Sequence, residues 1–85
     1  MMEVNEDTKV ILADNLIRYL RGIDNIDDVR LYNITEFSHM RKNIEGWKQL
    51  GMIDIQNSYI DLTGHKCYSV KIPADIVEYL RFLQL

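Results

Sequence analysis

Apolar residues near the start of the chain recur with helical spacing. Steps of three and four residues place five of them on one face: Leu12, Ala13, Leu16, Ile17 and Leu20. Asp7 is a good N-cap candidate, and Gly22 follows the last basic residue as a stop. This pattern predicts an amphipathic helix over about residues 8–21.

The next segment allows two interpretations. Asp24 or Asn25 can cap a short helix over residues 25–32, because both side chains accept hydrogen bonds from the free N–H groups at a helix start. Such a helix would turn three apolar side chains toward the core: Ile26, Val29 and Tyr32. The run from Val29 to Tyr32 can also be read as a strand. The helix is the favoured interpretation, and the strand is its alternative.

A second amphipathic run follows. Thr35 offers an N-cap oxygen and Gly51 a stop, so the pattern predicts a helix over about residues 35–50. Four apolar residues fall within an arc of about 80° and are expected in the core: Phe37, Met40, Ile44 and Trp47. The opposite face carries Ser38, His39, Lys42, Glu45, Gly46 and Gln49, with Arg41 and Lys48 at one edge.

The hydrophobic spacing becomes alternating after Gly51. Ile53 and Ile55 flank one polar residue, and Tyr68, Val70 and Ile72 do the same further on, which predicts an antiparallel hairpin over about residues 52–72. In the long connection between them, Ile60 and Leu62 either extend a strand or pack the loop down. Pro73 suits the first turn of a last helix, over about residues 74–83, that is apolar on more than one side.

Composition and charge narrow the class. The 85 residues suffice for a single domain, and 47% of them are hydrophobic. The single cysteine, Cys67, excludes an intrachain disulfide and fits a reducing, cytoplasmic setting. No apolar run is long enough to span a membrane, and the acidic N-terminus does not look like a signal peptide. The net charge is −3, yet residues 30–71 hold six basic and four acidic residues, a local surplus of two positive charges.

The order of these elements resembles the winged helix-turn-helix transcription regulators of bacteria, archaea and their viruses. The likeness covers about residues 24–72 and is carried by Ile44, Trp47, Leu50-Gly51-Met52-Ile53, Gly64 and Tyr68-Ser69-Val70. The resemblance implies an α+β fold with a three-helix core, a C-terminal hairpin wing and an added C-terminal helix. It also implies that the helix over residues 35–50 reads duplex DNA in the major groove.

On this interpretation the DNA-binding residues come from that helix and the wing: Ser38, His39, Arg41, Lys42, Lys48, Gln49, His65 and Lys66. The last helix, with more apolar surface than one partner helix can cover, predicts a homodimer through Tyr79, Phe82 and Leu83. The alternative is a winged-helix domain that binds proteins in a replication, segregation or transcription assembly, for which an acidic balance is unremarkable. No nucleotide-binding, metal or catalytic motif is present, so we expect neither an enzyme nor a cofactor, a metal or a small-molecule substrate.

Overall fold

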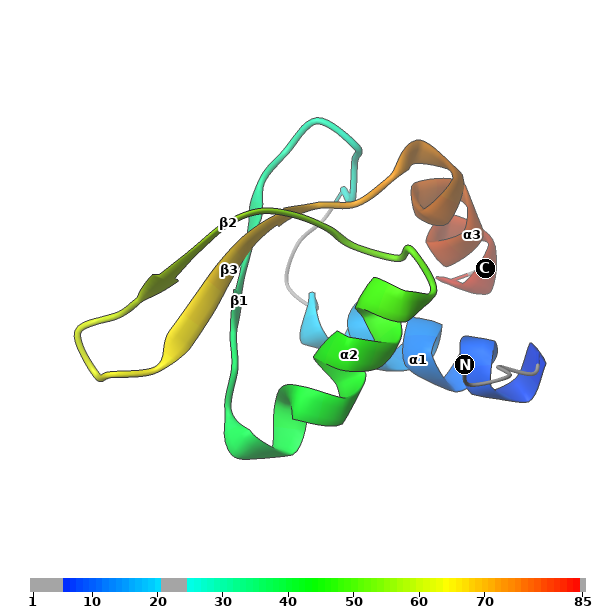
Figure 1. Cartoon of the computed structure of the whole chain (residues 1–85). Helices are drawn as coiled ribbons and strands as arrows, with labels where there is room; N and C mark the ends of the chain where they lie inside the picture. Colours follow the sequence, from blue (N-terminus) through cyan, green and yellow to red (C-terminus); the bar gives the residue numbers. More distant parts are fainter. Residues whose placement is uncertain (1–5, 21–24, 85) are drawn as a thin grey trace.

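The part of the chain that the structure describes forms three α-helices and a three-stranded antiparallel sheet (Figure 1). The computed structural model describes residues 6–20 and 25–84. The elements, in chain order, are α1 (Glu6–Tyr19), β1 (Tyr32–Thr35), the 3-10 turn η1 (Ser38–Met40), α2 (Arg41–Gln49), β2 (Asp54–Ile60), β3 (Lys66–Lys71) and α3 (Ala74–Gln84). The predicted α+β class is confirmed. None of the helices in the described part of the chain is long and apolar enough to cross a membrane.

The sheet has the strand order β1-β3-β2, and its helix-facing side is apolar. Tyr32 lies opposite Val70 and Ile34 opposite Tyr68, whereas Asn33 and Ser69 form a polar pair on the other face. The helices cover the first face and leave the second open (Figure 1). One core results, in which the largest fully buried side chains are Trp47, Leu16, Ile34, Met52, Ile72, Leu80 and Val70.

Trp47 joins α1 to α2. Its side chain is fully buried, and the indole Nε1–H donates a hydrogen bond of 2.8 Å to the carbonyl oxygen of Leu12. The ring also lies 6.2 Å from the ring of Tyr19, measured between centroids. A buried indole keeps its large apolar contact only if its N–H finds an acceptor, and α1 supplies one. The predicted core placement of Met40, Ile44 and Trp47 is confirmed.

Gly46 lies in the contact between α1 and α2, not on the outward face where its position in the pattern put it. A Cβ atom built on Gly46 would come within 2.8 Å of Leu12 Cδ1. Asn15 and Asn43, which share the same helix pair, are joined by a hydrogen bond of 3.0 Å. Glycine therefore lets the two helices approach, which offsets the roughly 1 kcal/mol that it costs in a helix interior.

The end of α2 has the geometry of a Schellman cap. Gly51 adopts φ +67°, its N–H donates to the carbonyl of Lys48, and the N–H of Met52 donates to the carbonyl of Trp47. Met52 and Trp47 are both buried, which supplies the apolar contact typical of this motif. The predicted stop at Gly51 is confirmed, and the cap leads the chain directly toward β2.

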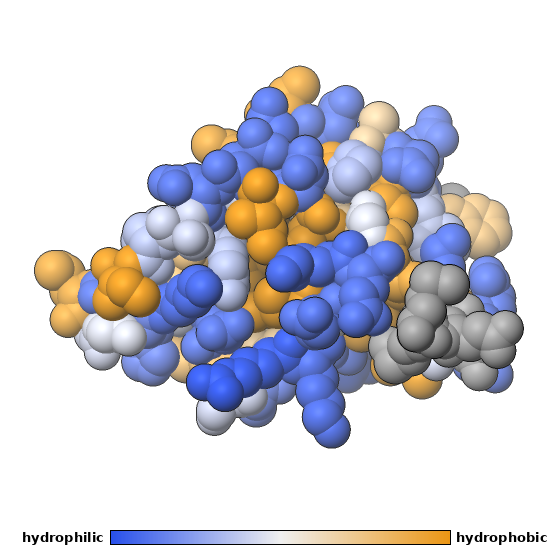
Figure 2. Space-filling model, viewed as in Figure 1, coloured by the Kyte–Doolittle hydropathy of each residue, from blue (hydrophilic) through white to orange (hydrophobic). Residues whose placement is uncertain are grey.

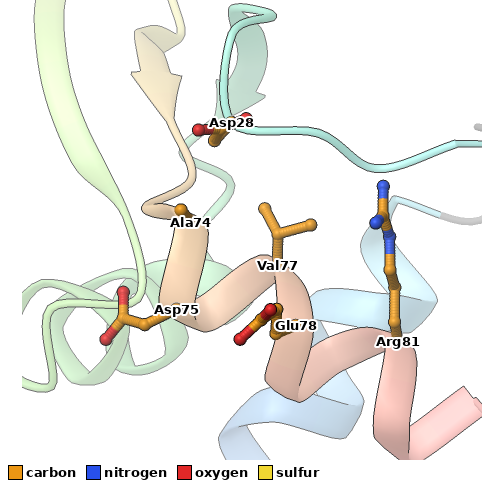
Figure 3. A pocket seen from close by; sticks show the side chains of 6 residues that line it. All are labelled: Asp28, Ala74, Asp75, Val77, Glu78 and Arg81. Carbon is orange, nitrogen blue, oxygen red and sulfur yellow. The ribbon is translucent and has the colours of Figure 1, made fainter.

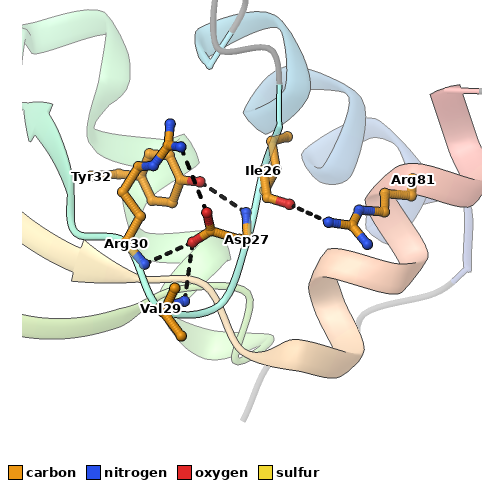
Figure 4. Close-up of polar contacts among 6 residues, drawn as sticks. All are labelled: Ile26, Asp27, Val29, Arg30, Tyr32 and Arg81. Carbon is orange, nitrogen blue, oxygen red and sulfur yellow. Dashed lines mark hydrogen bonds and ion pairs between the residues drawn. The ribbon is translucent and has the colours of Figure 1, made fainter.

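The predicted helix over residues 25–32 is wrong. Residues 25–31 form a loop that enters β1 at Tyr32. The carboxylate of Asp27 accepts the N–H groups of Val29 and Arg30, as an N-cap would, but the chain turns into a strand instead of a helix (Figure 4). Ile26 and Tyr32 are buried as expected, whereas Val29 is 75% exposed. Alternation of Tyr32 and Ile34 with polar residues favours a strand once a partner strand is available.

The next helix also starts later than the pattern predicts. Thr35 ends β1, where its N–H donates to the hydroxyl of Tyr19, and α2 begins only at Arg41 after η1. Phe37 precedes η1 and is 40% exposed, so its predicted core placement is wrong. Gly22, the expected stop of the first helix, lies outside the described residues. Asp7, the expected cap of that helix, lies inside α1.

The first strand of the hairpin is longer than the alternation of Ile53 and Ile55 indicates. β2 continues to Ile60, so only residues 61–65 separate it from β3. Of the two possibilities for the connection, Ile60 extends the strand, and Leu62 is fully exposed at the turn. Cys67 is buried.

Replacing Trp47 with Ala should lower the free energy of unfolding by about 3–5 kcal/mol, because it leaves a cavity and removes the indole hydrogen bond between α1 and α2. Urea unfolding followed by circular dichroism measures this. Lys48→Ala, on the exposed neighbour, should change stability by about 0.5 kcal/mol or less. A Trp47→Ala protein as stable as Lys48→Ala would contradict the core position.

Gly46→Val should destabilise the protein more than Glu45→Val does. Both substitutions place the same β-branched residue in the middle of α2. Helix propensity ranks Val above Gly but below Glu, so propensity alone would make Gly46→Val the less destabilising of the two. Only Gly46→Val drives a side chain into Leu12. We expect an additional loss of about 1–3 kcal/mol, the usual range for overpacking. Equal unfolding midpoints for the two variants would show that the helices do not meet at this point.

Candidate nucleic-acid interface

The solvent-facing strip of α2 carries most of the predicted site residues. Met40, Ile44 and Trp47 face the core, and Gly46 faces α1. At 100° per residue, the remaining positions form an exposed strip with Arg41 and Lys48 along one edge and Lys42 and Gln49 along the other. Glu45 lies between the two edges. Ser38 and His39, also exposed, precede the strip in η1.

Lys66 of β3 lies on the same side of the sheet as the helices. Lys66, Tyr68 and Val70 are two residues apart along β3, so their side chains point to the same side of the sheet. The Nζ atom of Lys66 lies 5.5 Å from the centroid of the Tyr68 ring. Tyr68 in turn donates a hydrogen bond of 3.1 Å to Glu36 Oε1. Lys66 is therefore held against an aromatic ring rather than left on a free strand end.

Tyr68 also connects the hairpin with α2 electrostatically. Burial raises the pKa of its hydroxyl, and the hydrogen bond to Glu36 raises the pKa further. The charge of Glu45 acts in the same direction, whereas the charge of Arg41 opposes it. Arg41 and Glu45 are thus the residues of α2 whose charges act on Tyr68, the ring that Lys66 approaches.

The cations of this surface are free of acidic partners within the described chain. The two ion pairs that the described residues form join Arg18 to Asp14 and Arg30 to Asp27. Arg41 and Glu45 are spaced for a helix-surface pair, yet they do not form one. The surface carries the side chains of Arg41, Lys42, Lys48 and Lys66 against those of Glu36 and Glu45, a surplus of two positive charges.

His39 and His65 meet at Phe37. The rings of His39 and Phe37 are stacked, with centroids 5.9 Å apart, and the His65 ring meets Phe37 edge-on at 4.9 Å. His65 Nδ1 lies 2.6 Å from the hydroxyl oxygen of Thr63. The fold therefore brings one predicted residue of η1 and one of the hairpin to the same place, around an aromatic ring that is 40% exposed.

The turn of the hairpin is organised by one carboxylate. Asp61 Oδ1 accepts hydrogen bonds from the N–H and hydroxyl of Thr63, at 2.9 and 2.6 Å, and from the N–H of His65, at 2.9 Å. These bonds lower the pKa of Asp61, with the Thr63 hydroxyl making the largest contribution. The turn is therefore closed and charged at neutral pH, when the carboxylate is ionised.

Two hollows flank the helices. One, of about 470 Å³, runs between α1 and α2. It is lined by Thr8, Leu12, Lys42, Glu45, Gly46 and Gln49, and most of the lining atoms are apolar. The other, of about 360 Å³, lies between the 25–31 loop and α3 and is lined by Asp28, Ala74, Asp75, Val77, Glu78 and Arg81 (Figure 3). Arg81 is engaged there, because it donates to the carbonyl of Ile26 at 2.9 Å (Figure 4). Lys42 and Gln49 line the first hollow, and the second contains none of the predicted site residues.

The residues predicted for a dimer contact occupy α3, which lies beside α1 at the end of the molecule away from the hairpin turn (Figure 1). Phe82 is 70% exposed. Tyr79 and Leu83 are half-buried, and Lys9 Nζ lies 4.7 Å from the centroid of the Tyr79 ring. Ile76, Val77 and Leu80 are buried in the core.

Comparisons of the chain with protein-family models, with curated proteins and with solved structures found no match.

Sequence patterns did not foresee the parts that Glu36 and Tyr68 have at this surface. Tyr68 is predicted as one of three inward residues of a strand, and it is half-buried against the core. No local pattern indicates a role for Glu36, because its partner Tyr68 lies 32 residues away along the chain. Only strand pairing brings the two together.

Proposed function

We propose that this protein is a small DNA-binding transcription regulator that contacts duplex DNA with α2 and with the β2–β3 hairpin. The observation that carries the proposal is the exposed strip of α2 with Arg41, Lys42 and Lys48, together with the exposed Lys66 on the side of β3 that the helices cover. Helix and hairpin together offer exposed cations, none of which forms an ion pair within the described residues. Phosphate contacts of this kind supply most non-specific DNA affinity.

The arrangement supports a winged-helix mode of binding with one departure. α2 passes through a Schellman cap straight into the hairpin, whose strand β3 pairs with β1 in the sheet order β1-β3-β2. The departure is the helix expected before α2, since residues 25–40 form a loop, β1 and the η1 turn. On this proposal α2 enters the major groove and Lys42, Gln49, Ser38 and His39 approach base edges or phosphates, while His65 and Lys66 contact the backbone next to it.

A homodimer is part of the proposal. Phe82 on α3, together with Val10 and Ile11 on α1, leaves exposed apolar surface on two adjacent helices. In a two-fold dimer the same patch of each subunit packs against its copy, so both patches would be buried. It would also present two α2 helices to one side of the DNA, about 34 Å apart as successive major grooves require.

A second candidate function is protein binding in a replication, segregation or transcription assembly. Two observations favour it. Glu36 and Glu45 lie among the cations, and the hollow between α1 and α2 has an apolar lining suited to a side chain of a partner. DNA binding at low salt separates the two candidates, because a purely apolar docking surface has no affinity for phosphates.

Lys66→Ala should weaken binding to duplex DNA and make the dependence on salt shallower. If Lys66 neutralises one phosphate, the slope of log K against log salt should change by about 0.9. Lys71→Ala is the matched control: it removes the same charge from the same strand, but from the opposite sheet face, and should leave the slope unchanged. Fluorescence anisotropy over a salt series measures both. Duplex binding that is undetectable even at low salt would overturn the DNA-binding proposal in favour of the protein-binding one.

Phe82→Glu should convert a dimer to a monomer while the fold is retained, because it places a charge in an apolar contact that is not part of the core. Light scattering at micromolar concentration should give twice the chain mass for the unchanged protein and the single-chain mass for the variant. Val29→Glu introduces the same charge at a similarly exposed apolar residue on the 25–31 loop and should leave the dimer intact. A single-chain mass for the unchanged protein would exclude the dimer.

A further inference from the structure

The strand β2 forms an open edge of the sheet. It pairs with β3 on one side, and no strand of the described residues pairs with its other side (Figure 1). The residues from Gln56 to Ile60 are all exposed. The opposite edge, at β1, is shorter, and α1 covers part of it, because the N–H of Thr35 donates to the hydroxyl of Tyr19 at 3.0 Å. The edge of β2 is therefore where a further strand can join the sheet.

The second half of β2 lacks the features that usually protect an edge strand. Charged side chains, proline and bulges discourage an edge from pairing with another chain. Asp54 and the bulge at Gln56 lie in the first half of the strand. The stretch from Asn57 to Ile60 is regular and contains neither a charge nor a proline. Ile60 is 65% exposed, and Figure 2 shows apolar surface at the end of the molecule where the hairpin projects.

The hydrogen bonds of the hairpin identify the backbone groups that face the open edge. The N–H of Asp61 donates to the carbonyl of His65 at 2.9 Å, so these residues form a hydrogen-bonded pair. Such pairs alternate with non-hydrogen-bonded pairs along an antiparallel ladder. Counted back from Asp61, the non-hydrogen-bonded positions of β2 are Ile60 and Ser58. The N–H and C=O groups of these two residues therefore point away from β3.

We propose that a second copy of this chain adds its own β2 to this edge, antiparallel, across a two-fold axis at Tyr59. In this register Ser58 lies opposite the partner's Ile60, and Ile60 lies opposite the partner's Ser58. Each of these pairs exchanges two hydrogen bonds, so every outward N–H and C=O of the two residues is used. An axis at Ser58 is less favourable, because it sets Ile60 opposite the partner's Gln56, at the bulge.

The self-complementarity of the strand argues for a second copy as the occupant. Residues 57–60 carry no charge, and Asp61 lies opposite the partner's Asn57, so no like charges meet. On the helix-facing side, Ile60 is a diagonal neighbour of the partner's Ile60, and the two cover exposed apolar surface. On the other side, the Tyr59 hydroxyl donates to Asn33 Oδ1 at 3.4 Å. The Tyr59 ring thus lies across the sheet and leaves the edge accessible.

This contact goes beyond the proposed function and is independent of DNA binding. It is also separate from the dimer proposed through α3, which lies at the end of the molecule away from the hairpin turn (Figure 1). The two contacts together join dimers into larger assemblies. Because one pair of strands supplies few bonds, we expect a dissociation constant of about 1 mM. At micromolar concentration the edges are therefore apart, and they pair where copies are crowded together.

Amide chemical shifts measured by NMR from tens of micromolar to millimolar protein test the register directly. An amide proton that gains a hydrogen bond moves downfield. The amide protons of Ser58 and Ile60 should move downfield as the concentration rises. Those of Asn57 and Tyr59 are the internal control, because these amides already bond to β3 at every concentration and should move much less.

Two substitutions at one position test the outward backbone group. Ser58→Pro removes an N–H that faces the open edge and leaves the ladder to β3 intact, a place where edge strands tolerate proline. Sedimentation equilibrium of the unchanged protein should show a mass that rises further between micromolar and millimolar concentration. Ser58→Pro should lose this rise. Ser58→Ala, which alters the same side chain and keeps the N–H, should retain it.

The possible outcomes separate this contact from the others. Constant shifts of Ser58 and Ile60 up to millimolar concentration would overturn the edge contact, and this holds even if Ser58→Pro does not fold. A rise in mass that Ser58→Pro retains would also overturn it. If Phe82→Glu abolishes all self-association while the Ser58 and Ile60 shifts stay constant, every contact between copies belongs to α3. None of these results bears on duplex binding, which the Lys66→Ala salt series tests separately.

Discussion

The contact between α1 and α2 is the constraint on which the rest of the structure depends. Leu12 of α1 receives α2 in two ways: its side chain occupies the space that a Cβ at Gly46 would need, and its carbonyl accepts the indole N–H of Trp47. Two neighbouring residues of α2 are thus tied to one residue of α1. This fixes how α2 is rotated about its own axis, because a helix held at two positions 100° apart cannot turn. The rotation in turn decides that Arg41, Lys42, Lys48 and Gln49 face solvent.

The end of α2 extends this constraint to the sheet. The Schellman cap at Gly51 sets the direction in which the chain leaves the helix, and Met52 packs back on Trp47 as it does so. β2 therefore starts at a defined angle to α2, and its pairing with β3 places Lys66 on the side that the helix faces. The spatial relation between helix and hairpin follows from one glycine, one buried indole and the register of two strands. The candidate interface is a consequence of that relation.

On the proposed function, the local distribution of charge lets an acidic molecule hold a polyanion. The surplus of two positive charges on the α2–hairpin surface is small, and Glu36 is engaged by the Tyr68 hydroxyl within it. Electrostatic attraction alone would therefore give only moderate affinity. On that proposal, shape contributes the remainder, through the exposed strip of α2 and the projecting hairpin. Such a surface depends less on salt than a strongly basic one.

Local patterns in the sequence determined the elements whose signals are self-contained. Helical spacing was sufficient for α1 and α3, alternation for β3, and the Gly51 stop for the end of α2, because each depends on residues close in the chain. Tertiary structure decided the rest. Residues 25–32 carry capping signals for a helix, yet Tyr32 and Ile34 pair with Val70 and Tyr68. The strand buries these side chains and satisfies their backbone hydrogen bonds. An isolated short helix, by contrast, has little stability of its own. Gly46 appears neutral in the sequence, and only the position of Leu12 shows that the helices meet there. Phe37 follows the helical spacing of the core, but the helix starts four residues later, since Thr35 is held in β1. Long-range partners, which no local pattern contains, decide all three positions.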